Sequence, residues 1–353
     1  MKEDKPVQGR PRRHRRWPAF SVLLLIVIAA AAWGGYTWHR LNHAPLPASA
    51  AGQVFVVDEG ASLSRLADSL AAHGVIEHAW DVKLLARIRG EAGHIQAGEY
   101  RVKPGMSASD LLQAMTSGEV VMHDFTIIPG ETFSEIRSRL LKQPAFRHDL
   151  KGQSAAEIMA RLGHPDQKAE GRFFPETYGF PRGTSGLEVL KRAYLAMQRH
   201  LQKAWEKRAP GLVLGSPYEA LIVASIIEKE SAVDSERTRI AGVFERRLKS
   251  GMPLGADPTV IYGLGDAYHG DLTYKNMEID TPYNTYLHRG LPPTPICMPS
   301  LASIVAALHP AEGTALYFVA KGDGTHVFSD TLAEQRRMIR KYQLHQGDGP
   351  DHD

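Results

Sequence analysis

The sequence has a single cysteine, Cys297, and none of the short motifs that mark the common metal- and nucleotide-dependent enzymes. One cysteine excludes an intrachain disulfide and a cysteine-rich zinc site. The patterns HExxH, GxSxG and GxGxxG and the P-loop pattern are absent, and the 16 histidines show no metal-ligand spacing. These absences argue against a zinc protease, a serine hydrolase of that type and a nucleotide-binding enzyme. Cys297 is most simply a small buried apolar side chain.

Positive charge is scarce outside the first 40 residues. The whole chain has 42 Lys and Arg against 39 Asp and Glu, but residues 1–40 hold eight of the basic residues and only two of the acidic ones. Residues 41–353 therefore hold 34 basic and 37 acidic residues. A globular part with no excess of positive charge does not favour binding to nucleic-acid phosphates, so we expect no nucleic-acid partner.

Charge is absent altogether from Ala19 to Trp38, which read AFSVLLLIVIAAAAWGGYTW. As a helix, 20 residues cover the roughly 30 Å hydrocarbon core of a bilayer. Seven Lys and Arg precede this run and one, Arg40, follows it closely. By the positive-inside rule, residues 1–18 form a basic cytoplasmic tail and 19–38 a transmembrane signal anchor. The sequence thus predicts a single-pass protein of the cell inner (plasma) membrane, with everything after residue 40 periplasmic or extracytoplasmic.

A cleaved signal peptide is the alternative, because Ala48-Ser49-Ala50 matches a small-residue cleavage pattern. Against it, the apolar run is longer than the roughly 7–15 residues of a signal h-region. We interpret 39–52 as a short linker and 343–353 as a flexible tail.

A short unit of β-prone run, glycine and helix recurs three times after this linker. It appears at 53–70, 98–115 and 124–140, with Ser62, Ser107 and Thr132 as the expected helix N-caps two residues past each glycine. The first copy resembles the start of a LysM module, a small fold that binds N-acetylated glycan strands. The resemblance implies a LysM-like glycan-binding subdomain over 53–121. A generic capped helix after a strand is an equally good interpretation of these residues alone.

The clearest candidate for catalysis lies at 215–251, GSPYEALIVASIIEKESAVDSERTRIAGVFERRLKSG. Ser216, Pro217 and Glu219 predict a helix start, and the apolar residues that follow predict a helix buried on most sides. A second helix is expected from Asp234 or Ser235, ending at Gly251.

Two glutamates at the end of the buried helix differ in their helical faces. Glu230 continues the apolar stripe of Val223, Ile226 and Ile227, whereas Glu228 falls on a smaller and more polar face. Desolvation disfavours a charged carboxylate, so the pKa of Glu230 should be raised, as a general acid requires. A charged run that only solvates a helix end is the simpler alternative.

Polar and aromatic residues cluster further on, in DPTVIY at 257–262, TPYNTY at 281–286 and GLPP at 290–293. Rings and short polar groups beside prolines and glycines suit a sugar-lined groove, although ordinary turns would look the same. The candidate substrate-binding residues in these segments are Asp257, Tyr262, Tyr283, Asn284 and Tyr286.

Taken in order, the motifs ASIIEKES, VFxxRL, DPTVIYG, TPYNTY and GLPPTPI resemble the YceG-like family of endolytic murein transglycosylases. GRFFPETY at 171–178 and YFVAKGDGTHVFS at 317–329 extend the resemblance over nearly the whole chain. It implies an α+β fold in which an N-terminal transmembrane helix and a small LysM-like subdomain precede a larger mixed α/β catalytic domain over 122–342. One position departs from the family, which often has Asn where Arg246 stands.

The resemblance also implies a reaction. The family cleaves the β-1,4 bond between N-acetylmuramic acid and N-acetylglucosamine in nascent peptidoglycan, leaving 1,6-anhydro ends and terminating strand elongation. Glu230 would be the catalytic carboxyl, used first as acid and then as base, with Ser231, Glu228 and Glu176 added to the substrate-binding residues. No metal or organic cofactor is implied, and wall-synthesis proteins are further partners to expect. A hydrolytic muramidase and a non-catalytic glycan-binding scaffold remain alternatives.

Overall fold

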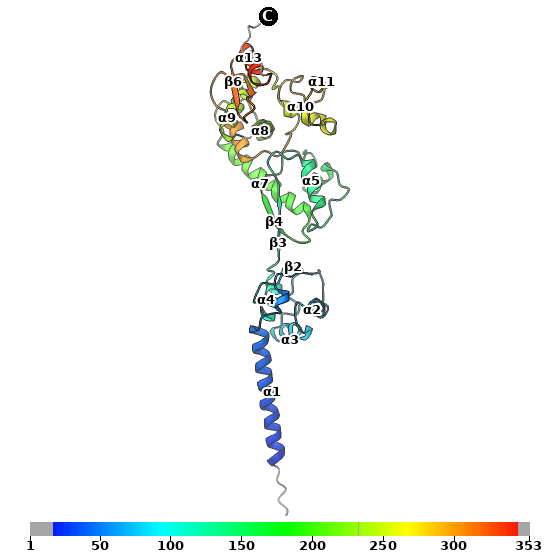
Figure 1. The fold of residues 1–353 in the computed structure, drawn as a ribbon. Coiled ribbons are helices and arrows are strands. Elements are labelled where there is room, and N and C mark those ends of the chain that lie inside the picture. Colours follow the sequence, from blue (N-terminus) through cyan, green and yellow to red (C-terminus); the bar gives the residue numbers. More distant parts are fainter. Residues whose placement is uncertain (1–16, 232, 345–353) are drawn as a thin grey trace, which may run out of the picture. The chain divides into compact units, whose positions relative to one another are not determined.

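The computed structural model describes residues 17–231 and 233–344, so the predicted tail is described only for Gln343 and Leu344, and nearly all of the basic N-terminal segment lies outside the described residues. The chain divides into two compact units between Val121 and Met122 (Figure 1). Both combine helices with antiparallel strand pairs, and the described residues contain three separate two-stranded sheets. The fold is therefore mixed, with helices and strands in each unit, in agreement with the coarse prediction.

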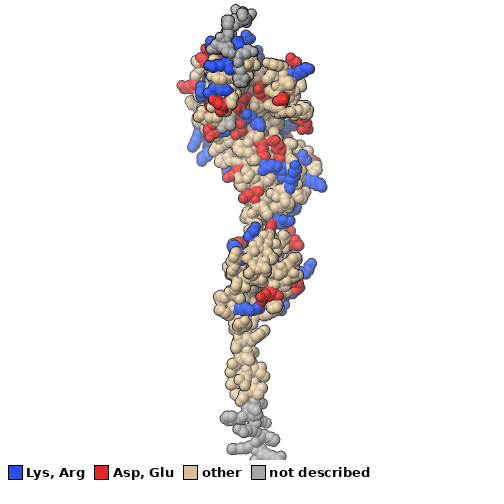
Figure 2. Space-filling model, in the orientation of Figure 1, with Lys and Arg blue, Asp and Glu red and all other residues tan. Residues whose placement is uncertain are grey.

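The first helix, α1 (Trp17–His43), is the one described helix long and apolar enough to cross a membrane. Its candidate span is Phe20–His43, 24 residues of mean hydropathy 1.9 and almost entirely uncovered by protein. Most of its surface in Figure 2 is free of Lys, Arg, Asp and Glu. The helix runs five residues past the predicted end of the span at Trp38, because no proline or glycine interrupts it before Pro45.

The rest of the first unit packs three α-helices and a strand pair around one core. Leu41 and Ala50 belong to that core, and the Leu46 N–H donates to the Met106 carbonyl at 2.7 Å. The predicted linker, 39–52, is thus attached to this core at Leu41, Leu46 and Ala50, while more than half of its residues are exposed. The elements are η1 (Ala48–Ala50), β1 (Val54–Val57), α2 (Leu63–Ala72), α3 (Ala79–Arg89), β2 (Gly98–Arg101) and α4 (Ala108–Ser117), with Val54 of β1 opposite Arg101 of β2.

The three predicted N-caps are confirmed. Ser62, Ser107 and Thr132 each accept a backbone N–H from three residues ahead, at the starts of α2, α4 and α5 (Phe133–Lys142). At Ser107 and Thr132 the acidic residue three ahead completes a capping box. Such caps satisfy N–H groups that the first helical turn leaves unpaired. They can be predicted from the sequence because both partners lie within a few residues of each other.

The second unit begins with a strand pair and three helices around an aromatic core. The strands β3 (Met122–Thr126) and β4 (Thr177–Pro181) are antiparallel, with Thr126 opposite Thr177. The helices are α5, α6 (Ala155–Arg161) and α7 (Gly186–Glu206). Phe146 stacks on Phe180 and Phe133 on Phe173 in this core.

The rest of the second unit contains the helix α8 (Pro217–Glu230), whose residues from Ala220 to Ile227 are all buried. This helix packs against α7, α9, α10 and α12 (Figure 1). Ser216 caps it as predicted, but Glu219 accepts the Gly215 N–H instead of closing a capping box. The other elements are α9 (Asp234–Lys249), α10 (Asp257–Leu264), η2 (Gly265–Ala267), α11 (Tyr274–Met277), α12 (Leu301–Leu308), β5 (Tyr317–Ala320), β6 (His326–Ser329) and α13 (Leu332–Tyr342).

Candidate active site

Glu230, the last residue of α8, lines a cavity of about 420 Å³ in the second unit. Three of the residues singled out in the sequence meet there, Glu230, Asp257 and Tyr286. The apolar stripe of α8 ends at this cavity, so the last residue of the buried helix places its carboxyl group in the cavity. The other lining residues are Arg247, Gly255, Met277, Tyr317, Phe318, Val319, Ala320, His326, Gln335, Ile339 and Gln343.

The electrostatic environment of Glu230 favours its protonated form. Burial and, next, the negative charge of Asp257 raise the pKa of Glu230 to about 8, and the positive charge of Arg247 opposes them. The side chain keeps partial exposure and lines the cavity, so the proton can reach a bound molecule. A protonated carboxyl at neutral pH, open to a cavity, is suited to general acid catalysis.

Asp257 and Tyr286 form a hydrogen-bonded pair beside Glu230. Asp257 is the exposed first residue of α10, and the Tyr286 hydroxyl donates to its Oδ1 at 2.6 Å. Burial and the Asp257 carboxylate raise the pKa of Tyr286, so its hydroxyl keeps the proton that it donates. The pair brings together two segments 29 residues apart and holds a negative charge at the cavity.

Arg247 is a cavity residue that the sequence interpretation did not select. Its guanidinium donates to the Leu254 carbonyl at 2.6 Å and to the Leu316 carbonyl at 2.7 Å, and it lies 5.1 Å from the centre of the Tyr317 ring. A signal for it is present in the sequence, because Arg247 continues the helical spacing of the apolar residues Ile240, Val243 and Phe244 in the predicted second helix. A cation in an apolar stripe indicates a buried electrostatic role.

His326 is a second cavity residue that the sequence did not suggest, although it lies within 317–329, one of the motifs that carry the family resemblance. Its Nδ1 lies 2.8 Å from Glu236 Oε2, and its backbone N–H donates to the same carboxyl group at 3.1 Å. Both side chains are about nine-tenths buried. These bonds from the His326 side chain and backbone lower the pKa of Glu236 despite its burial.

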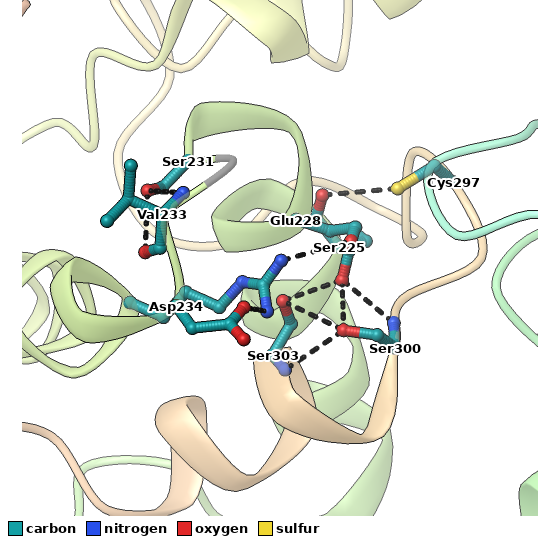
Figure 3. A network of polar contacts seen from close by, with 9 residues as sticks. Ser225, Glu228, Ser231, Val233, Asp234, Cys297, Ser300 and Ser303 are labelled. Atoms are coloured by element: carbon teal, nitrogen blue, oxygen red, sulfur yellow. Dashed lines mark hydrogen bonds and ion pairs between the residues drawn. The ribbon is translucent and has the colours of Figure 1, made fainter. Parts of the chain in front are cut away.

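Glu228 is held in a polar network away from the cavity (Figure 3). Its Oε2 accepts hydrogen bonds from the Ser300 N–H at 2.8 Å, the Ser300 hydroxyl at 2.5 Å and the Ser303 hydroxyl at 2.7 Å. Arg237 lies 3.6 Å from its other oxygen and also pairs with Asp234. Glu228 therefore fastens the start of α12 to α8, and the structure does not bring it to Glu230.

Ser231 and Asn284 satisfy their hydrogen bonds within the chain. The buried Ser231 hydroxyl donates to the Val233 carbonyl and accepts the Val233 N–H, both at 3.1 Å, in the turn after Glu230 (Figure 3). The fully buried Asn284 donates to the Met277 and Ile279 carbonyls at 2.7 and 2.9 Å. Both residues shape the backbone around the cavity and do not line it.

Tyr262 and Tyr283 lie in a separate cluster. Their rings pack edge to face with centres 4.8 Å apart, and the Tyr262 hydroxyl donates to the buried Glu170 at 3.0 Å. Burial raises the pKa of Glu170 to about 7. Glu176 is exposed, next to β4. None of these residues lines the Glu230 cavity. Of the predicted groove residues, Asp257 and Tyr286 therefore belong to the cavity, and Tyr262 and Tyr283 pack outside it.

The sequence of this chain matches the model of the YceG-like family over residues 55–341. The chain belongs to the YceG-like family. An endolytic murein transglycosylase of Bacillus subtilis strain 168 is 32% identical over 307 residues, 81% of this chain and 83% of the relative. One of Streptococcus pneumoniae serotype 2 strain D39 is 27% identical over 92% of this chain, which spans 65% of that relative's length. A crystal structure of a YceG-like protein from Listeria monocytogenes is 30% identical, with a TM-score of 0.50 over 82% of this chain and all of that one.

Arg246, where the family resemblance led us to expect Asn, lies outside the Glu230 cavity. Its guanidinium donates to the Ala315 carbonyl at 2.7 Å and to the Ala311 carbonyl at 3.1 Å, fixing the loop before β5. It lines a second hollow of about 240 Å³ together with Arg239 and Asp330. Among the described residues of this YceG-like chain, no three His, Cys, Asp or Glu side chains are grouped as metal ligands.

Proposed function

We propose that this protein is a lytic transglycosylase that cleaves the glycan strands of peptidoglycan with Glu230 as its catalytic carboxyl. The observation that carries the proposal is the position of Glu230, a carboxyl with a pKa of about 8 that ends a buried helix and lines a cavity. Support for the substrate comes from the YceG-like relatives named endolytic murein transglycosylases. The bond cleaved is the β-1,4 link between N-acetylmuramic acid and N-acetylglucosamine.

In this proposal one carboxyl group moves two protons. Protonated Glu230 donates to the glycosidic oxygen as the bond to the muramic anomeric carbon breaks. The resulting carboxylate then takes the proton from the 6-hydroxyl of the same sugar as that oxygen attacks, closing a 1,6-anhydro ring. Intramolecular attack is favoured when the nucleophile is already positioned. The reaction therefore consumes no water and needs no second carboxylate as a nucleophile.

The other charged groups of the cavity set the conditions for this step. The Asp257 carboxylate adds to the effect of burial in raising the pKa of Glu230, and Tyr286 anchors that carboxylate by its hydrogen bond. An anion near the anomeric carbon would also stabilise the positive charge that develops on the sugar. Arg247, fixed by backbone carbonyls, limits the rise in the pKa of Glu230.

A hydrolytic muramidase is the second candidate. The observation that favours it is Asp257, a second carboxyl group in the same cavity, since hydrolytic glycosidases use two. The two candidates share the acid, Glu230, and differ in the product, which allows them to be separated.

We further propose the predicted topology, with α1 as an uncleaved inner-membrane anchor, the N-terminus cytoplasmic and both units exported. Residues 53–121 then form a LysM-like subdomain that holds glycan, residues 122–342 act as the catalytic domain, and strand elongation ends where the enzyme cuts. The compact strand–helix–helix–strand arrangement from β1 to β2 supports a binding module. Deleting 53–121 should weaken binding to purified glycan strands, and unchanged binding would leave this unit as a spacer.

The experiment that tests the enzyme against a glycan-binding scaffold uses purified sacculi. The full-length protein in detergent should release soluble muropeptides from them, and Glu230→Gln should release almost none while still binding the sacculi. Binding without release by the unchanged protein would favour the scaffold, including its role as a tether for wall-synthesis proteins.

A further inference from the structure

His326 presents an unused ring nitrogen at the Glu230 cavity. It begins β6, opposite Ala320 of β5, and lines the same cavity as Glu230 and Asp257. Its Nδ1 is engaged by Glu236, whereas its Nε2 has no hydrogen-bond partner within 17–231 and 233–344. The His326 side chain is about nine-tenths buried, and its free Nε2 at the cavity can form a hydrogen bond to a molecule bound there.

Glu236 fixes both the orientation and the tautomer of this ring. Its carboxyl group accepts the His326 backbone N–H at 3.1 Å and lies 2.8 Å from Nδ1, so ring and backbone are held by one group. Because the pKa of Glu236 is lowered, it is a carboxylate at neutral pH and can only accept. The proton of a neutral His326 ring therefore sits on Nδ1, and Nε2 is left with a lone pair.

Packing leaves the ring little freedom to turn away. Phe318 meets it edge to face with ring centres 5.5 Å apart, and Glu236 is itself held near the positive charge of Arg239. Preorganised polar groups of this kind lose little entropy on binding, and they give a site its specificity.

We propose that His326 is a binding residue for the glycan in the Glu230 cavity, where its Nε2 accepts a hydrogen bond from a hydroxyl or acetamido N–H of a sugar. Glu236 is the positioning residue that holds the acceptor in place. The inference rests on the proposed function, because the sugar donors it names belong to that substrate. The proton transfers remain with Glu230.

The test measures binding of purified glycan strands to the full-length protein carrying Glu230→Gln, so that cleavage does not interfere. Adding His326→Phe should raise the Kd about 2- to 12-fold, the loss expected for one hydrogen bond. His326→Gln, whose carbonyl oxygen can still accept, should recover part of the loss. His288→Phe is the matched control, because His288 pairs with Asp280 at 2.6 Å on the exposed surface and does not line the cavity.

Glu236→Gln separates positioning from simple folding. The amide N–H₂ can donate to Nδ1 and move the ring proton to Nε2, so binding should weaken although the new side chain has the same size. Combined with His326→Phe, it should add little further loss, since Glu236 acts through His326. Unchanged Kd values for His326→Phe and Glu236→Gln would overturn the inference. Failure of the Glu230→Gln protein itself to bind strands would instead overturn the proposed glycan substrate.

Discussion

Two substitutions on the same helix, Glu230→Gln and Glu228→Gln, should have opposite effects: the first should stop cleavage and leave the fold intact, and the second should weaken the fold and leave cleavage nearly unchanged. Glu230→Gln removes the titrating proton, so cleavage should fall by about 10²- to 10⁴-fold, the usual contribution of general acid–base catalysis. The side chain makes no hydrogen bond within the described chain, so none is lost. The fold should therefore survive the change.

The same substitution should make the protein more stable in alkali. A carboxyl whose pKa is raised on folding holds its proton more tightly in the folded chain, so the free energy of unfolding falls as the pH rises from about 4.5 to about 8. Gln carries no proton to lose. Glu230→Gln should match the unchanged protein near pH 4 and unfold at a higher temperature than it at pH 9.

Glu228→Gln should behave in the reverse way. Three donors from Ser300 and Ser303 meet one oxygen of Glu228, and Arg237 lies near the other. Weakening hydrogen bonds to a charged group costs about 1.5–3 kcal/mol, which lowers the Tm of a unit of this size by about 3–12 °C. Cleavage by the folded fraction should change little, because Glu228 lies away from the cavity.

The assay combines release of soluble muropeptides from sacculi with thermal unfolding of the same preparations at pH 4, 7 and 9. A larger loss of cleavage in folded Glu228→Gln than in Glu230→Gln would refute the assignment of the two acids. Equal unfolding temperatures for Glu230→Gln and the unchanged protein at pH 9 would refute the claim that the Glu230 carboxyl is desolvated.

Two more predictions concern pH and topology. Cleavage should decline as the pH rises above about 8, where Glu230 loses its proton. Asp257→Asn should move that decline to lower pH, because it removes a nearby negative charge. pH–rate profiles measure both effects, and an unmoved decline would show that Asp257 does not act on Glu230. An export-dependent reporter enzyme fused to the C-terminus should be active, and N-terminal sequencing should find a start near Met1; a mature start at Ala51 would contradict the anchor.

Local features of the fold could be predicted from the sequence, because their causes lie within a few residues. The N-caps Ser62, Ser107 and Thr132 bond to backbone groups three positions on. The apolar stripe of α8 likewise identified Glu230 as the desolvated acid, and burial is the main cause of its raised pKa.

Features that depend on distant segments could not be predicted in this way. Glu228 looked like a second site residue, but Ser300, 72 positions later, turns it into a structural anchor. Asn284 looked like a sugar ligand, yet its amide is used within its own loop. The position of Arg247 among apolar residues indicated burial, but nothing near Arg247 or His326 in the sequence shows that they share a cavity with Glu230.

The measurement that tests the central claim most directly is digestion of sacculi in water enriched in heavy oxygen, followed by mass spectrometry of the muropeptides. If Glu230 directs attack by the sugar's own 6-hydroxyl, the new muramic ends carry no heavy oxygen and weigh one water less than hydrolytic ends. Heavy oxygen at the new muramic end of most products would contradict the lytic mechanism and identify a muramidase that uses Asp257 as well as Glu230.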